Sequence, residues 1–189
     1  MKPIYTLLLI FASFSASSQQ LKWSRDTLLT WNNFKVPVDS ATYAATSYLN
    51  MTYEYRFLPF EKEGVYRAKF KVTHYFDADK STTIINKQGA DLLKHEQTHF
   101  DIAEYFARQL KYAFETYTYT KNIRIEIIDI YQRIDAEREK MQTLYDTQAK
   151  HGEDVVMQKK WEEFVAGLLA TNPPLNEVLK TEIISGCQP

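Results

Sequence analysis

Hydrophobic and polar residues follow a two-residue period in part of the N-terminal half of the chain. Thr42 to Phe57 and Val65 to Phe76 are rich in threonine, tyrosine, phenylalanine and valine, with partial alternation. Such segments are typical of half-buried strands. Pro59 to Gly64 lies between them and has the composition of a turn, so the pattern predicts an antiparallel hairpin.

The period changes to a helical one from about Asn86 and stays helical to about Ala149, with an interruption near Thr116 to Asn122. A last helical stretch runs from about Val155 to Leu169, before two consecutive prolines. We therefore expect an α+β fold in which a small antiparallel β-unit is followed by long helices. There is no internal repeat and no linker of disordered composition, which predicts a single domain over residues 19–189.

The N-terminus has the pattern of a signal peptide over residues 1–18. A lysine follows the initiator methionine, Ile4 to Phe14 is almost entirely apolar, and Ala16-Ser17-Ser18 supplies small residues for cleavage. The apolar run is too short for a permanent membrane span, and no cysteine follows it for lipid attachment. We expect a secreted or periplasmic protein without a stable membrane anchor after cleavage. After the signal peptide, residues 22–39 form a leading segment with few signals of regular structure. We expect it to be held in place by its aromatic side chains, Trp23, Trp31 and Phe34.

Charge and cysteine content exclude several classes of function. The chain has 189 residues, with 23 Lys+Arg against 24 Asp+Glu and a formal net charge of −1. A near-neutral chain does not recruit nucleic acid through its overall field. The single cysteine, Cys187, excludes an internal disulfide framework and a cysteine-rich metal site.

The candidate chemistry lies in the first long helical segment. His95, Glu96 and His99 form the pattern H-E-x-x-H. Helix residues four apart lie on the same side, so both imidazoles can bind one ion. The glutamate between them can take a proton from water bound to that ion. The pattern predicts a zinc site with His95 and His99 as ligands and Glu96 as the catalytic base.

The helical wheel places this pattern on an apolar face. Glu96 falls within the apolar stripe, with His99 beside it and His95 at its edge. Polar groups on an apolar face cost free energy unless they find partners. A metal would satisfy both imidazoles, whereas the alternative is a hydrogen-bonded His–Glu–His cluster without metal. The opposite face is expected to be solvated and carries Lys94, Gln97, Asp101, Glu104 and Arg108.

A catalytic zinc site has three protein ligands and an open fourth position. Glu137 lies on the apolar stripe of the next helix, and His151 lies near its end, before a glycine suited to a helix stop. Spacing leaves both open as the third ligand. Glu104 is on the wrong side of its helix, and His74 is expected to be a sheet residue near the cleft.

Residues 93–104 resemble the central helix of the predicted secreted bacterial zinc peptidases called domain of unknown function 922. The family's second motif, Y-D-x-x-T-x-H-G, is similar to residues 145–152, with Ala149 at the threonine position. Its leading motif is similar to Leu29–Phe34, with Asn33 where the family has aspartate. The similarity spans roughly Trp31 to Trp161. The two differences from the family, at Asn33 and Ala149, affect neither the predicted ligands nor the predicted base.

The resemblance implies a ligand set of His95, His99 and His151. Asp146 would then orient a ligating imidazole through its second nitrogen. Tyr145 would either donate a hydrogen bond to a developing oxyanion or be a core aromatic. Glu137 would be a polar group paired with a cation such as Arg138 at a helix contact.

These observations predict an exported zinc-dependent peptidase acting on a peptide or protein substrate. Zinc would polarise the carbonyl and lower the pKa of its bound water, and Glu96 would pass that proton to the leaving amine. The extended peptide would lie along an exposed strand of the hairpin. Imidazole ligands suit zinc but also cobalt, nickel or copper. Three alternatives remain. The first is a zinc amidase acting on cell-wall peptides, and the second is a non-catalytic binding protein with a structural zinc ion, in which Glu137 completes a four-ligand site with His95, His99 and His151. The third is an accidental motif without tightly bound metal.

Overall fold

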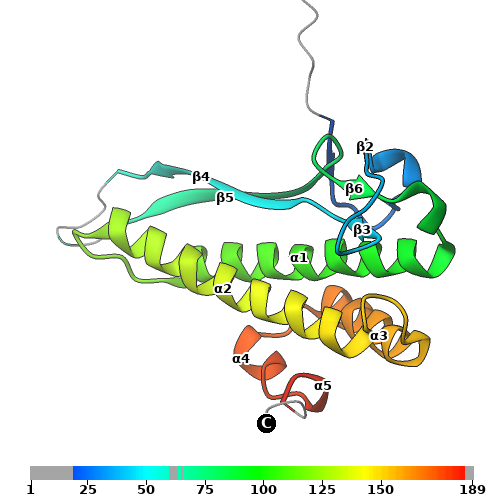
Figure 1. The fold of residues 1–189 in the computed structure, drawn as a ribbon. Helices are drawn as coiled ribbons and strands as arrows, with labels where there is room; N and C mark the ends of the chain where they lie inside the picture. Colours follow the sequence, from blue (N-terminus) through cyan, green and yellow to red (C-terminus); the bar gives the residue numbers. More distant parts are fainter. Residues whose placement is uncertain (1–18, 60–63, 65, 186–189) are drawn as a thin grey trace, which may run out of the picture.

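The computed structural model describes residues 19–59, 64 and 66–185 (Figure 1). The predicted signal peptide, residues 1–18, lies outside this range, as does most of the predicted turn between the hairpin strands. Within the described part of the chain, no helix is long and apolar enough to cross a membrane.

The predicted hairpin is present as two long antiparallel strands. β4 (Leu49–Phe57) pairs with β5 (Ala68–Asp77) in a register that runs from Leu49 opposite Phe76 to Phe57 opposite Ala68. The short strand β1 (Gln20–Lys22) adds to the other side of β5 and gives the order β1-β5-β4. One face of this sheet packs on the helices, and Met51 and Phe70 are buried there.

A second small sheet contains the first part of the segment 42–57, which the sequence predicts as a single strand. β2 (Val36–Pro37), β6 (Thr82–Thr83) and β3 (Ala45–Thr46) form it in the order β2-β6-β3, with β2 parallel and β3 antiparallel to β6. The predicted strand 42–57 is therefore wrong at its start. The break follows from Ser81, whose hydroxyl accepts the backbone N–H of Tyr48 at 2.9 Å in place of a strand partner.

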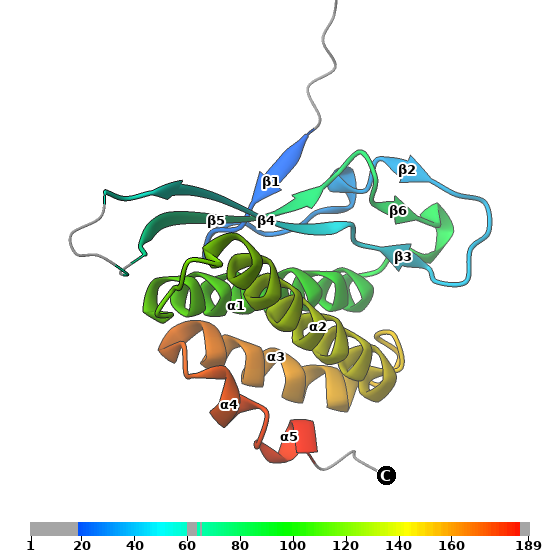
Figure 2. The ribbon, with the colours of Figure 1, turned by 90° about the vertical axis from the view of Figure 1, so that its left-hand side faces the viewer.

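The helices confirm the predicted period and its interruption. α1 (Ala90–Thr116) and α2 (Ile123–Ala149) are followed by α3 (Val155–Thr171) and by the short α4 (Leu175–Val178) and α5 (Glu182–Ser185). Single 3₁₀ turns occupy Trp31–Asn33 and Ile85–Lys87. α1 lies between the sheet on one side and α2 and α3 on the other (Figures 1 and 2). The α+β fold class is confirmed.

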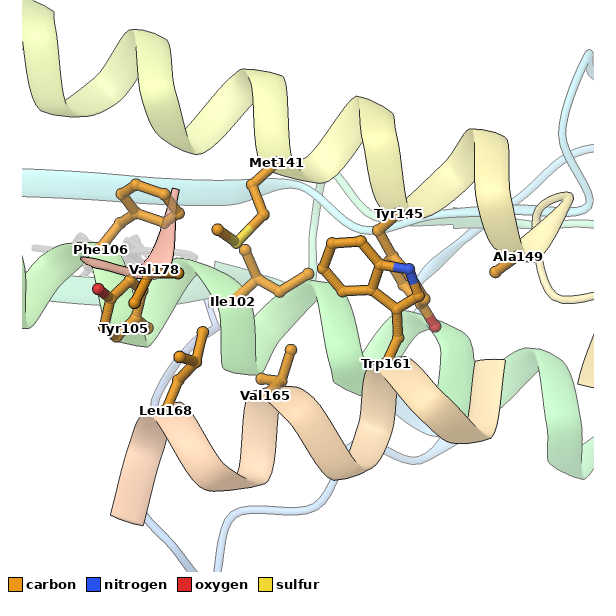
Figure 3. Close-up of a cluster of buried hydrophobic side chains, with 10 residues drawn as sticks. All are labelled: Ile102, Tyr105, Phe106, Met141, Tyr145, Ala149, Trp161, Val165, Leu168 and Val178. Carbon is orange, nitrogen blue, oxygen red and sulfur yellow. The ribbon is translucent and has the colours of Figure 1, made fainter. Parts of the chain in front are cut away.

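The central position of α1 explains why twelve of its 27 residues are buried. Figure 3 shows the cluster that joins it to α2, α3 and α4, with the rings of Tyr145 and Trp161 at its centre, 5.3 Å apart. On another side the leading segment covers α1, and Trp23 donates its indole N–H to Asp101 at 2.7 Å. Of the predicted solvated face, only Lys94 is exposed. The prediction is wrong at Gln97, Asp101, Glu104 and Arg108, which are partly buried because the leading segment, β5 and neighbouring elements pack over them.

Candidate metal centre

The H-E-x-x-H residues lie on the second and third turns of α1, at the base of a cleft. His95 is 2% exposed and Glu96 is 3% exposed, although neither is apolar. The cleft measures about 310 Å³ and is bounded by the segment 43–49 on one side and by the helices on the other. Its helical lining comprises Leu92, His95, Glu96 and His99 of α1 and Arg138, Glu139, Gln142 and Asp146 of α2, with His151 beyond the end of α2.

Three ligand atoms converge at this point. Nε2 of His95 and Nε2 of His99 are 3.0 Å apart. Oδ1 of Asp146 lies 3.0 Å from the first nitrogen and 2.9 Å from the second. Two donors bound to one tetrahedral zinc ion are about 3.3 Å apart, so this triangle needs little change to hold one. Two imidazoles and a carboxylate form a donor set that fits zinc.

The orientation of His99 is fixed from α2 by Gln142. The Gln142 amide nitrogen donates to the backbone carbonyl of His99 at 3.0 Å, so its oxygen Oε1 faces Nδ1 of the same histidine at 2.5 Å. Nδ1 therefore carries a proton, and Nε2 is the nitrogen that would supply a lone pair to an ion at the convergence point.

Tyr145 supports the two imidazoles by packing. Its ring stacks on His95 with centroids 4.6 Å apart and meets His99 edge-on at 4.9 Å. The side chain is fully buried, and burial raises the pKa of its hydroxyl. Of its two predicted roles, the structure favours the core aromatic.

Glu96 is held by a residue from outside the helices. Ser47, between β3 and β4, donates its hydroxyl to Oε2 of Glu96 at 2.5 Å. This hydrogen bond ties the wall of the cleft to the carboxylate at its base. One carboxylate oxygen is thereby engaged by the protein, and Oε1 is left as the oxygen for other partners.

The electrostatics of the cluster centre on Asp146. Burial opposes ionisation of this carboxyl, but hydrogen bonds from His95 and His99 hold its pKa well below its usual range. Burial lowers the pKa of His95, which disfavours the charged form of its imidazole. Burial would do the same to His99, but the hydrogen bond and charge of Asp146 outweigh it and raise the pKa of His99.

The structure brings His151 to the same cluster from the cleft mouth. Its Nδ1 is 3.3 Å from Oδ1 of Asp146, its side chain is 47% exposed, and its ring packs on Tyr43 with centroids 4.5 Å apart. Helix α2 ends earlier than the glycine suggests, because Lys150 and His151 both adopt left-handed backbone angles, with φ of 49° and 53°. His151 as a ligand stays a prediction.

The two other candidate positions have their own partners. Glu137 forms an ion pair with Lys140 at 2.6 Å. This agrees with the expectation that Glu137 is a polar group paired with a cation, but the cation is Lys140 of the same helix and not Arg138. His74 is a sheet residue as predicted, buried in β5 against Phe100, with Nδ1 3.7 Å from Glu104.

Sequence reasoning missed Ser47 and Gln142, and it gave Asp146 only an orienting role. Gln142 stands four residues before Asp146, so the helical spacing that places Asp146 in the cleft could have found it. No sequence signal indicates Ser47, because it reaches Glu96 from the connection between β3 and β4, 49 positions away.

Comparison with known families identifies one family that matches the chain. A family described as "Bacterial protein of unknown function (DUF922)" matches residues 26–152, which include the three converging residues, Glu96 and His151. No curated protein and no solved structure matches. With most of its length matched, the chain belongs to the DUF922 family of bacterial proteins.

Proposed function

We propose that this protein is an exported zinc-dependent peptidase whose ion is held by His95, His99 and one further residue. One observation carries the proposal: three ligand atoms from two helices lie about 3 Å apart at the base of a cleft, beside a buried glutamate. Such a cluster costs free energy if it binds nothing, because three polar side chains must give up water. Zinc bound there would supply a Lewis acid that polarises a substrate carbonyl and acidifies water.

Asp146 is the third ligand that the geometry favours. Its Oδ1 is close to both Nε2 atoms, whereas His151 reaches that oxygen from a half-exposed position. The expected set of His95, His99 and His151 therefore becomes His95, His99 and Asp146 in this proposal. His151 remains beside the cluster at the cleft mouth, where it can contact a bound substrate.

Glu96 performs the proton transfers. Ser47 occupies Oε2 of its carboxylate, so Oε1 accepts the proton of a water molecule as the water oxygen adds to the carbonyl carbon of the scissile amide. The same carboxyl then gives that proton to the nitrogen of the scissile amide as the C–N bond breaks. Amide hydrolysis fits this arrangement because the leaving nitrogen must be protonated before it departs.

The edge of β3 favours an extended peptide as the substrate. β3 is an outer strand of its sheet, and the backbone N–H of Ile84 donates to the carbonyl of Ala44 at 2.8 Å. In an antiparallel ladder, the backbone groups of Ala45 then point away from β6. Because residues 43–49 line the cleft, a peptide pairing with this edge would pass over Glu96. This edge replaces the hairpin strand as the proposed substrate platform.

The ligand set is tested by zinc content and zinc affinity. We expect one zinc per mature chain, a large loss with His95→Ala, His99→Ala and Asp146→Ala, and retention with Glu137→Ala. His151→Ala separates the two ligand sets: retained zinc supports Asp146, and loss of zinc with Asp146→Ala unaffected restores the histidine set. An unmodified protein that takes up no zinc would refute the site.

Catalysis is tested with Glu96→Gln, which keeps the shape of the side chain and removes its basicity. Peptide hydrolysis should disappear while zinc content stays unchanged, because Glu96 is not a ligand. Casein and peptidoglycan fragments should be tested in parallel, since cleavage of the fragments alone would make the protein a cell-wall amidase. Bound zinc without hydrolysis of either substrate would indicate a structural zinc site.

A further inference from the structure

Two buried side chains beside Gly152 each have a polar atom without a partner among the described residues. Nδ1 of His95 and Oε1 of Gln158, on α3, form no hydrogen bond with any other described residue. His95 and Gln158 are each only 2% exposed, so bulk water does not satisfy these atoms. A buried donor or acceptor left unpaired costs about 1–3 kcal/mol, which makes two such atoms in one place a feature that needs an explanation.

Both side chains lie against the same glycine. A Cβ atom built on Gly152 would be 3.3 Å from Oε1 of Gln158, 3.3 Å from Cβ of His95 and 3.5 Å from its Cγ. Nδ1 is bonded to that Cγ. The absent side chain of Gly152 therefore leaves a space that His95 and Gln158 share, and Oε1 can approach Nδ1 within it.

The amide of Gln158 is already oriented for such a contact. Its nitrogen donates to the backbone carbonyl of Asp91, one turn before His95, at 2.9 Å. That bond leaves Oε1, an acceptor, as the free end of the amide. Gln142 has the same arrangement at the other imidazole, with its nitrogen on a carbonyl of α1 and its oxygen on Nδ1 of His99.

We propose that Gln158 is a positioning residue for the metal centre, whose Oε1 accepts the Nδ1 proton of His95 when Nε2 binds the ion. The inference rests on the proposed function, because it requires Nε2 of His95 to be the ligating nitrogen. Pairing satisfies both orphaned atoms at once and fixes the tautomer that presents a lone pair to the metal. Each ligating imidazole is then held by a glutamine from a different helix, Gln142 of α2 and Gln158 of α3.

The test compares zinc affinity in two matched variants. Gln158→Met keeps the length of the side chain and removes the acceptor, and it should weaken zinc binding by about 10–100-fold in a chelator competition. Gln109→Met removes an equally buried glutamine from the far end of α1, where its partners are Asn172, Pro173 and Leu175. This control should lose stability without losing zinc affinity. Gln158→Glu keeps an acceptor and should bind zinc more tightly than Gln158→Met.

A second measurement uses the unmodified zinc-loaded protein and does not depend on a variant that folds. Long-range ¹H–¹⁵N spectra should show the His95 proton on Nδ1, slow in exchange with water and close to the Gln158 side chain. Metal on Nδ1, or an Nδ1 proton remote from Gln158, would overturn the inference. Equal zinc affinity in Gln158→Met and the unmodified protein would overturn it too, while the zinc site would stand. Absence of zinc binding by the unmodified protein would instead refute the proposed function.

Discussion

Replacing Gly152 with alanine tests how closely the loop after α2 approaches His95. The residue has a φ of +88°, and an added Cβ would lie 3.3 Å from both His95 and Gln158. A left-handed backbone costs an alanine about 1–2 kcal/mol. Overpacking by one methyl group in a well-packed interior adds about 1–3 kcal/mol. We therefore expect Gly152→Ala to lower the free energy of unfolding by about 2–5 kcal/mol.

Two other glycines separate these contributions. Gly64 also has a positive φ, of +79°, but no heavy atom among the described residues would lie within 4 Å of its Cβ. Gly64→Ala should therefore show only the backbone cost of about 1–2 kcal/mol. Gly167 lies within α3 with open space around it, so Gly167→Ala should raise stability by about 0.5–1 kcal/mol through helix propensity.

Urea unfolding of the metal-free proteins, followed by tryptophan fluorescence, measures all three changes against the unmodified chain. Trp161 is fully buried, so its emission reports loss of the helical core. Zinc affinity of Gly152→Ala should fall as well, because the methyl group displaces His95. A Gly152→Ala protein no less stable than Gly64→Ala, with unchanged zinc affinity, would refute the close approach as the reason for glycine.

Three further predictions concern His74, Ser47 and Tyr145. Burial lowers the pKa of His74 below 6.5, against the opposing effect of Glu104 on α1, with Asp101 of α1 and Arg138 of α2 as the other charged neighbours. The unfolded chain therefore takes up a proton below about pH 6.5 that the folded chain does not, and stability should fall there by at most about 1.4 kcal/mol per pH unit. His74→Phe should flatten this slope in urea unfolding between about pH 7.5 and about pH 5.5, and an unchanged slope would contradict the reasoning. Ser47→Ala should reduce kcat on a peptide substrate by roughly tenfold without loss of zinc, because it removes a hydrogen bond to the Glu96 carboxylate. The control Thr46→Ala changes the exposed neighbouring residue and should leave kcat unchanged. Tyr145→Phe should leave kcat unchanged and alter stability by less than about 1 kcal/mol, since it keeps the buried ring; a large fall in kcat would restore the oxyanion role.

Local patterns in the sequence are enough to predict much of this fold. The change from a two-residue to a helical period marks where the hairpin ends and α1 begins, and the break near residues 116–122 falls between α1 and α2. The H-E-x-x-H spacing brings His95 and His99 together on one helix face, because residues four apart are neighbours there whatever surrounds the helix. These features depend on contacts within a few residues, which the order of residues specifies directly.

Contacts between distant segments decide the rest. The division of segment 42–57 between two sheets depends on where Ser81 meets Tyr48, and the burial of Asp101 and Glu104 depends on the leading segment and β5 covering α1. The candidate site is completed the same way, by Ser47 from the connection between β3 and β4 and by Asp146 from α2, and in our proposal by Gln158 from α3. Residue spacing fixes which side of its own helix each side chain occupies, but only the packing of α2 and α3 against α1 fixes which side chains meet. The sequence therefore determined the two histidines and the glutamate, and the tertiary structure decided which residues converge on them.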